Sequence, residues 1–317
     1  MSDQRGILNE GFRRVWRYQR VLWFIFIVNL LLAHFGAAPA VSKVEPVTDH
    51  SLQAQRLSGM FDYGSFSELS ANPEVDLFSL TGVSVDFAIV FFGVILFLTG
   101  GILEAYRSGR KLTTREFFEA CGSYFWRWVR LLILMLIILI PVVMMVVGIR
   151  TLVGPLLLVP AQEKLGFWLA LGGIGVVGLF LMCIRLWFDM AQVRAVVEEE
   201  TGMWRNAGSA FKITFGNFGS LFWMYLRISV VGWLAFALGL WIWARMPPKQ
   251  FEWTILVLEL AILAGFGTRL WQRASEMVWY QRRFLAPLAA APVTPAPIVP
   301  VPDPLLTIAP PPPLSQT

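Results

Sequence analysis

The stretch that decides the fold class is VRLLILMLIILIPVVMMVVGI at residues 129–149, in which Arg130 is the only charged residue. A helix rises about 1.5 Å per residue, so roughly 20 residues cross a hydrocarbon core of about 30 Å. A helix that is apolar on every side over this length is typical of a membrane span. The stretch therefore predicts a transmembrane helix.

The rest of the chain has a composition that fits this prediction, with 56% hydrophobic and only 15% charged residues among 317. Such a composition argues against an ordinary soluble domain. Segments of comparable length and apolar character lie at 21–38, 83–103, 129–149, 165–188, 220–244 and 251–271. The predicted fold class is therefore all-α, a polytopic membrane protein whose transmembrane domain of six helices occupies residues 1–283.

The Lys and Arg residues that flank the segments predict their orientation, because these residues favour the cytoplasmic side of a membrane. Five arginines precede the first segment, and further basic residues cluster at 107–130, 185–212 and 269–283. The loop at 39–82 carries two basic residues against six acidic ones. We therefore expect 39–82 to be an extracytoplasmic loop and both termini to be cytoplasmic.

Amphipathic segments at 7–18, 113–128 and 203–219 each precede an outward-running span. Each has aromatic and aliphatic residues on one helical face and charges on the other, a pattern that predicts a cytoplasmic interfacial amphipathic helix. Thr113 and Glu116 have the spacing of a capping box, which predicts a helix start there. The order of interfacial helix, outward helix, external loop and inward helix then recurs, so we expect three copies of one unit.

Residues 284–317 contain eleven of the nineteen prolines, and Asp303 is their only charge. Such a segment cannot bury enough apolar surface to fold, so we expect a disordered Pro-rich tail of polyproline II character. It is either a solvated extension or a ligand for a cytoplasmic partner.

Residue patterns typical of enzymes and cofactor proteins do not stand out in the sequence. The two histidines, His34 and His50, have no Cys or His at metal-ligand spacing, and no Gly-rich loop opens a helix. We therefore expect no metal, no cofactor, no enzyme activity and no nucleic-acid partner, with membrane lipids as partners. Small residues within the spans are expected to serve helix packing. They are Gly172, Gly173, Gly175 and Gly178 and the pairs Gly166/Ala170, Ala235/Gly239 and Ala261/Gly265.

Charged residues inside the spans form the candidate site, because a charge at the centre of a bilayer costs at least ~2.5 kcal/mol. Arg227 lies roughly 10 Å into the fifth span from the inner side and requires compensation, since arginine stays protonated. Glu104 and Asp189 are its expected partners, with Arg185 nearby. Glu259 lies in the outer half of the sixth span, so a direct pair with Arg227 is not favoured. The set is either an ion-pair network that fixes helix register or a charged inner vestibule that binds a solute or lipid headgroup.

Two stretches resemble a loose bacterial family of six-helix membrane proteins, which includes the membrane domain attached to some glycerophosphodiester phosphodiesterases. They are FDMAQVRAVVEEETGMWRNAGSAF at 188–211 and GFRRVW at 11–16, which is followed by VNLLLA. The EFF motif at 116–118 is similar to one in uncharacterised stand-alone bacterial proteins. The resemblance implies a topology and a location in the bacterial inner membrane. It does not imply phosphodiesterase activity, because the chain has no such catalytic domain.

The predicted function is that of a non-enzymatic membrane scaffold or partner subunit. The alternative is a transporter or lipid-handling protein that uses the charged inner vestibule. Three repeated units resemble neither of the common inverted-repeat transporter plans, which weakens the transporter interpretation.

Overall fold

The computed structural model describes residues 2–48, 64, 67–68, 77–157, 159, 163–246 and 251–286. Within these residues the chain is helical and has no strand. The elements are α1 (Ser2–Arg17), α2 (Gln19–Thr48), α5 (Leu77–Ser108), α6 (Thr114–Leu157), α7 (Glu163–Val197), α8 (Met203–Gly216), α9 (Phe218–Trp243), α10 (Phe251–Tyr280) and the π-helical turn η1 (Gln281–Leu285). Six of them, α2, α5, α6, α7, α9 and α10, are long and apolar enough to cross a membrane. The predicted all-α class with six such helices is therefore confirmed.

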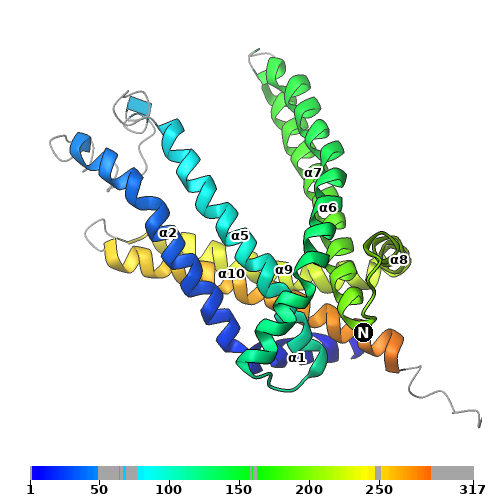
Figure 1. The fold of residues 1–317 in the computed structure, drawn as a ribbon. Helices are drawn as coiled ribbons and strands as arrows, with labels where there is room; N and C mark the ends of the chain where they lie inside the picture. Colours follow the sequence, from blue (N-terminus) through cyan, green and yellow to red (C-terminus); the bar gives the residue numbers. More distant parts are fainter. Residues whose placement is uncertain are drawn as a thin grey trace, which may run out of the picture.

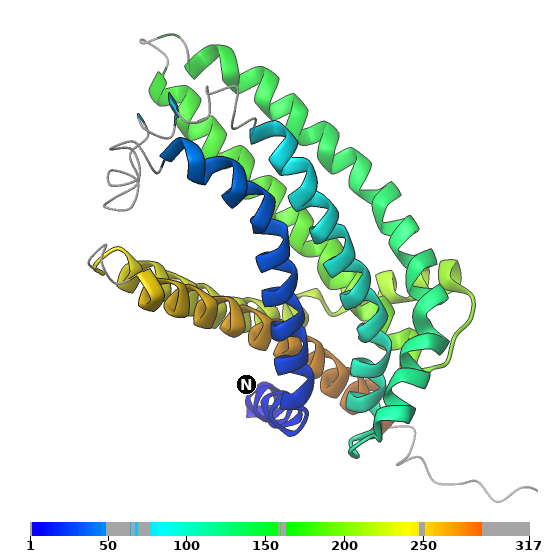
Figure 2. The same ribbon diagram turned by 60° about the vertical axis from the view of Figure 1, so that its left-hand side comes forward.

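The long helices run in neighbouring pairs, α2 with α5, α6 with α7 and α9 with α10 (Figure 1). The pairs converge at one end and spread apart at the other, as Figure 2 also shows. Arg17 Nη1 donates to the Gly109 carbonyl (2.7 Å) and Arg14 Nη1 to Gln281 Oε1 (2.9 Å), so α1, the α5–α6 connection and η1 meet at the converging end. We call this the closed end.

The packed core lies toward the closed end. Its largest fully buried side chains come from the C-terminal halves of α5, α7 and α10, the start of α6 and the first half of α9, and include Tyr106, Trp128, Met190, Leu221 and Met277. Toward the spread end, Met144, Ile174 and Leu238 are more than half exposed, at 66%, 68% and 56%. Apolar side chains on the outside of long helices are typical of surfaces that face lipid.

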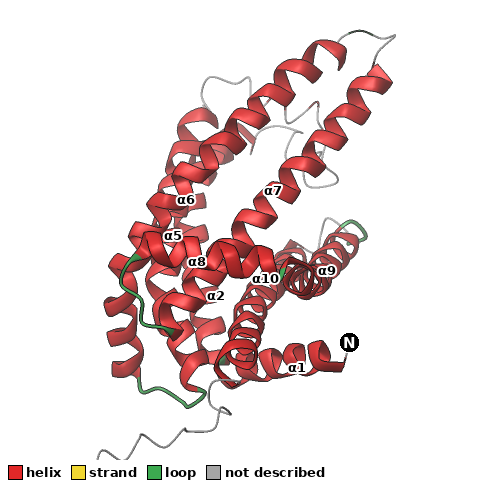
Figure 3. Cartoon of the chain, turned by 90° about the vertical axis from the view of Figure 1, so that its right-hand side faces the viewer, coloured by secondary structure: helices red, strands yellow, loops and turns green. Residues whose placement is uncertain are grey.

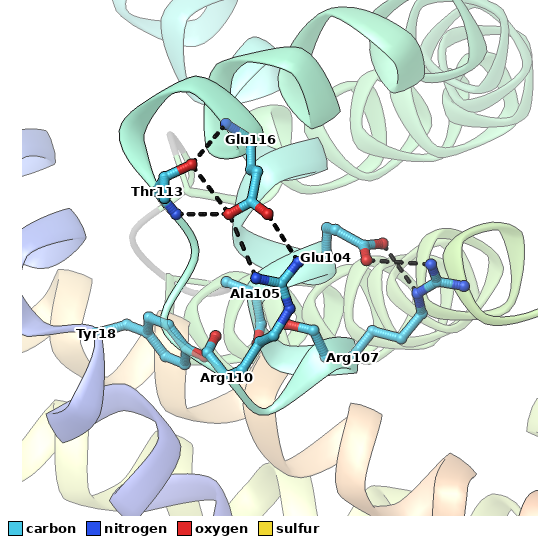
Figure 4. A network of polar contacts seen from close by, with 8 residues as sticks. Tyr18, Glu104, Ala105, Arg107, Arg110, Thr113 and Glu116 are labelled. Carbon is cyan, nitrogen blue, oxygen red and sulfur yellow. Dashed lines mark hydrogen bonds and ion pairs between the residues drawn. The ribbon is translucent and has the colours of Figure 1, made fainter.

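The start of α6 shows the predicted capping box. Glu116 N donates to Thr113 Oγ1 (3.3 Å), and Thr113 N donates to Glu116 Oε2 (2.8 Å). Arg110 Nη2 binds the other carboxylate oxygen of Glu116 at 2.8 Å (Figure 4). The backbone N–H groups of Thr113 and Glu116 therefore each have a side-chain acceptor, and this fixes where α6 begins.

Two of the three amphipathic segments form separate helices, and the third is part of a longer one. Segment 7–18 lies mainly in α1, which ends at Arg17, and most of segment 203–219 forms α8, which ends before Asn217. Asn217 Nδ2 donates to the Ile213 carbonyl (3.0 Å) and closes the end of α8. The segment at 113–128 is not separate, because α6 continues from it through the apolar stretch as one helix of 44 residues. No proline lies between Thr114 and Ile140, so nothing forces a break there.

The helix α1 packs against α10 at the closed end (Figure 3). A Cβ atom added at Gly11 would lie 2.3 Å from Ser275 Oγ, so the helices approach closely only because residue 11 lacks a side chain. Trp271 Nε1 donates to the Leu8 carbonyl at 2.8 Å. The N-terminal helix is therefore held by the last long helix of the described chain.

The glycines within the spans follow the packing prediction only in part. A Cβ at Gly239 would lie 2.9 Å from Ala261 Cβ, and one at Gly173 would lie 2.8 Å from Ile149, so these positions pack closely. The prediction is wrong within the described chain for Gly172, Gly175 and Gly178 of α7 and for Gly265 of α10, because an added Cβ there meets nothing within 4 Å. The three glycines of α7 face away from α6, which α7 meets through other positions such as Gly173.

The predicted loop at 39–82 is shortened at both ends, since α2 continues to Thr48 and α5 begins at Leu77. Most of the loop between these helices lies outside the described residues. The predicted Pro-rich tail lies outside them as well, from residue 287 onward.

Candidate functional site

The centre of the site is an ion pair between Asp189 on α7 and Arg269 on α10. Arg269 Nη1 lies 2.6 Å from Asp189 Oδ2 and Nη2 lies 2.7 Å from Oδ1, so the pair is bidentate. The Tyr225 hydroxyl on α9 donates to Asp189 Oδ2 (3.2 Å) and accepts from Arg269 Nη1 (2.6 Å). Asp189 is buried. The three side chains therefore join α7, α9 and α10.

Polar side chains one turn further extend this pair into a network. Gln272 Oε1 accepts long hydrogen bonds from Arg269 Nη1 (3.4 Å) and Arg185 Nη2 (3.5 Å), and Gln272 Nε2 donates to Ser229 Oγ (2.9 Å). The Arg185 guanidinium lies 5.6 Å from the centre of the Tyr225 ring, within range of a cation–π contact. The network thus contains two guanidinium groups and one carboxylate.

A cavity of about 350 Å³ lies beside this network, between α5, α6, α7 and α10. Most of its lining is aliphatic or aromatic, and includes Ile95, Leu131 and Leu181. The polar part of the lining consists of Thr99, Arg185, Asp189, Gln192, Arg269 and Arg273. Three guanidinium groups against one carboxylate give this part of the cavity a positive surplus. The cavity therefore has mostly apolar walls and one cationic part, formed by Arg185, Arg269 and Arg273, which we call its floor.

Three buried polar atoms on lining residues have no hydrogen-bond partner among the described residues. They are Trp128 Nε1, Arg273 Nε and Gln192 Oε1. Arg273 does bond through Nη1, which donates to Thr99 Oγ1 on α5 at 2.9 Å. A buried donor left without an acceptor costs about 1–3 kcal/mol, and native structures contain few of them. The indole N–H and the Arg273 Nε–H are therefore buried beside the cavity without an acceptor among the described residues.

Glu276 adds a second buried carboxylate on α10, one turn beyond Arg273. Its side chain is fully buried, and neither carboxylate oxygen has a hydrogen-bond partner within the described chain. It does not line the cavity. Its carboxyl group lies three residues after Arg273, on the same side of α10.

The structure brings together two of the five residues predicted for the site. Asp189 and Arg185 both belong to the network. Arg227 lies on the exposed face of α9, and the Asp189 carboxylate contacts Arg269 instead. Glu104 pairs with Arg107 one turn later (2.9 Å), near the closed end. Glu259 lies about 15 Å from Arg269 along α10, so it is not part of the network.

Sequence reasoning missed Tyr225, Arg269, Arg273 and Glu276. The sequence predicts a sixth span at 251–271, so Arg269 lies at its end and Arg273 beyond it, among the basic residues that indicate the cytoplasmic side. The helix α10 continues to Tyr280, so both arginines lie well within it. Their spacing of four residues, followed by Glu276 three residues later, places all three on one face of a helix. That periodicity was the available signal.

The fold and cavity define an all-α protein with six helices of membrane-spanning length and a cationic pocket among four of them. Comparison with protein-family models, with curated proteins and with solved structures found no match to this chain. The resemblance to the membrane domains of glycerophosphodiester phosphodiesterases therefore stays a prediction.

Proposed function

We propose that the chain is an integral protein of the bacterial inner membrane that binds an anionic amphiphile in the cavity between α5, α6, α7 and α10. Its role is lipid handling, and both termini face the cytoplasm. The observation that carries this proposal is the cavity with apolar walls, a floor of three guanidinium groups, and two buried donor atoms, Trp128 Nε1 and Arg273 Nε, that have no partner among the described residues.

The charge of the floor selects the ligand's headgroup. A phosphate or carboxylate accepts charge-assisted hydrogen bonds from guanidinium groups and from the indole N–H. Arg269 is already held by Asp189, whereas Arg273 Nε and Trp128 Nε1 have no acceptor among the described residues. We therefore place the acidic group beside Arg273 and Trp128.

The apolar walls select the remainder of the ligand. The lining residues of α7 extend from Leu181 to Gln192, a distance of roughly 16 Å along the helix. Its apolar members Leu181, Ile184 and Phe188 can cover an alkyl chain, which a small hydrophilic anion would not need. A ligand with an acidic head and a hydrocarbon chain therefore fits better than a free inorganic anion.

In this proposal the cavity lies in the cytoplasmic half of the membrane, and charge and amphipathicity support that location. The basic residues at the closed end favour the cytoplasmic side. The amphipathic helices α1 and α8 lie in the membrane interface in this proposal, with arginines toward anionic headgroups. The cationic floor lies near that same end, so its ligand is drawn from the inner leaflet.

The test is to purify the full-length chain gently from membranes and to identify its lipids by mass spectrometry. Wild type is compared with Arg273→Gln and with the control Arg130→Gln, which changes an exposed arginine on α6. We expect wild type and the control to retain an acidic lipid at a fixed ratio, and Arg273→Gln to lose most of it. Equal amounts of that lipid in all three proteins would overturn the proposal.

A scaffold role is the second candidate, and one observation favours it. At Gly172, Gly175 and Gly178 an added Cβ would have no atom of another described helix within 4 Å, so this part of α7 is open. A transmembrane helix of another protein could approach closely at such small residues. In the same purification, a protein partner at a fixed ratio and no specific lipid would favour this role.

A further inference from the structure

A second amphiphilic site lies on the other side of α5, between α2 and the start of α6. Its polar part is a cavity of about 550 Å³, lined by the start of α2 and by the α5–α6 connection. Next to it runs a groove of about 510 Å³ along α2, α5 and α6. The two share Phe24 and Phe118, so they form one continuous surface that we call the α2–α6 groove.

The polar part of the α2–α6 groove is basic. Arg17, Arg20 and Lys111 line it, and no lining residue is acidic. Arg17 Nη1 is engaged by the Gly109 carbonyl (2.7 Å), while Arg20 and Lys111 are exposed. The nearby carboxylate of Glu116 is already bound by Arg110 and by Thr113 N, as Figure 4 shows. The basic residues therefore face this cavity without a lining carboxylate to neutralise them.

The other part of the groove is apolar throughout. Val90, Val94 and Phe97 of α5 line it together with Phe24, Phe118 and Phe125. The rings of Phe97 and Phe118 stack at 6.3 Å and fix the wall between α5 and α6. From Val90 to Phe97 the groove follows α5 for roughly 10 Å. Gly93 leaves it open, because an added Cβ there would meet nothing within 4 Å.

We propose that the α2–α6 groove binds an anionic phospholipid. The phosphate lies at Arg20 and Lys111, and one acyl chain follows the apolar part past Gly93. Charge complementarity selects the acidic headgroup, and the continuity of the two parts through Phe24 and Phe118 matches the junction of headgroup and chain. No residue lines both this groove and the central cavity, so the two sites are independent.

The first test removes the basic end. Native mass spectrometry of the full-length protein, after delipidation, counts added phosphatidylglycerol or phosphatidylcholine. Arg20→Gln/Lys111→Gln is compared with Arg13→Gln/Arg115→Gln, which removes the same charge from exposed positions that do not line the groove. We expect the first variant to bind phosphatidylglycerol at least tenfold more weakly and the control to bind it as wild type does. An equal loss in both would show general surface attraction and would overturn the proposal.

The second test blocks the chain end without a change of charge. Gly93→Leu places a side chain in the groove, and Gly122→Leu is its control, since both glycines are helical and neither has an atom within 4 Å of an added Cβ. We expect only Gly93→Leu to lose one bound phosphatidylglycerol per chain. Retention of that lipid by Gly93→Leu would overturn the proposal.

The central cavity serves as an internal reference in both tests. Arg273→Gln should keep the lipid of the α2–α6 groove and lose the ligand of the central cavity, and the groove variants should do the reverse. Loss of the groove lipid in Arg273→Gln would overturn the independence of the two sites. If the proposed function is wrong and the central cavity binds no lipid, the groove variants should still lose phosphatidylglycerol. The failure of one proposal can therefore be told from the failure of the other.

Discussion

Asp189 and Arg269 show at the scale of single residues how this fold tolerates charge in a buried place. The guanidinium binds both carboxylate oxygens, and Tyr225 contacts both partners. Desolvation of two charges costs several kcal/mol, and only such close geometry offsets it. The pair therefore fixes how α7 and α10 lie against one another, while its net contribution to stability stays small.

Replacement of one partner of the ion pair should lower the free energy of unfolding more than replacement of both. We expect Arg269→Met to destabilise the protein by about 3–5 kcal/mol, because it leaves the Asp189 carboxylate buried without its counter-ion. Arg269→Met/Asp189→Asn should recover most of that loss, since the amide that replaces the carboxylate carries no charge. Thermal unfolding in detergent measures both. A double variant no more stable than Arg269→Met would show that the two residues are not coupled.

A substitution at Trp128 tests whether its indole N–H donates to the bound lipid. Trp128→Phe removes the buried Nε1–H and keeps an aromatic ring in the core. If a ligand oxygen accepts from Nε1, the variant should retain several-fold less acidic lipid than wild type. Trp126→Phe, on the same helix but 69% exposed, should retain the normal amount. Undiminished lipid together with a higher melting temperature would mean that the indole has no acceptor in the cavity.

The site could be predicted from the sequence only in part, and the reason is the rotation of helices. Depth along a span follows from residue counting, which predicts Asp189 and Arg185, one helical turn apart, at nearly the same depth. The face on which a residue lies depends on which neighbours the helix meets. Arg227 follows Tyr225 by two residues, which places it on nearly the opposite side of α9 from the network. Its depth alone made it a candidate.

At the scale of elements, α1 shows how a short helix is attached to the bundle. Gly11 lets the backbone of α1 approach Ser275, and Glu10 binds Arg282 at 2.6 Å and Arg14 at 2.7 Å. The indole of Trp271 adds a hydrogen bond to the Leu8 carbonyl. Packing, ion pairing and hydrogen bonding thus act over the same short length of α10 and η1.

A side chain at Gly11 should release α1 from α10. Gly11→Val places atoms where Ser275 lies, so the helix must move away. Hydrogen exchange at residues 2–17 should become faster, with little change in the core around Trp128. Gly208→Val on α8 has the same change in helix propensity but no atom within 4 Å, so it should leave α1 protected. Unchanged protection in Gly11→Val would contradict the observed contact.

Acid should weaken the same attachment. Burial by itself raises the pKa of Glu10, but hydrogen bonds from Arg282 and Arg14 outweigh burial and hold the pKa below its ordinary value of 4.5. A lowered pKa in the folded state means that the stabilisation is complete above that ordinary value and is lost as pH falls through the folded-state pKa. Hydrogen exchange of α1 corrected for intrinsic rates should rise at about pH 3.5 relative to pH 6. Glu10→Gln should abolish this pH dependence.

The helices themselves could be predicted well, because each apolar segment carries its own length and periodicity. The break between α8 and α9 occurs at Asn217, a residue that readily ends a helix. The continuity of α6 was harder to foresee, since Thr114–Trp128 has the amphipathic pattern of a surface helix. A change of pattern along a sequence does not require a break in the backbone.

For the whole molecule, the arrangement of loops defines one testable topology. Single cysteines are placed at Ser65 and at Thr201 in a background with Cys121→Ala and Cys183→Ser. An impermeant thiol reagent added to intact spheroplasts should label residue 65 and spare residue 201, because basic loops favour the cytoplasmic side and the proposed topology puts residue 201 there. Permeabilised cells, in which both should react, are the control. The reverse pattern in intact spheroplasts would invert the proposed orientation.

The docking of α1 onto α10 also has a consequence for biosynthesis. Leu8 and Trp271, which are hydrogen-bonded to each other, lie 263 residues apart, so the ribosome completes one long before the other exists. At roughly 5–20 residues per second, α1 waits about 13–53 s for its docking surface. During that time the Gly11 face and Glu10 are open to other contacts, such as a chaperone or the lipid surface. Attachment of α1 is thus a late step of assembly, and a chain truncated before residue 271 would leave α1 undocked, a mark by which a protease could recognise an unfinished protein.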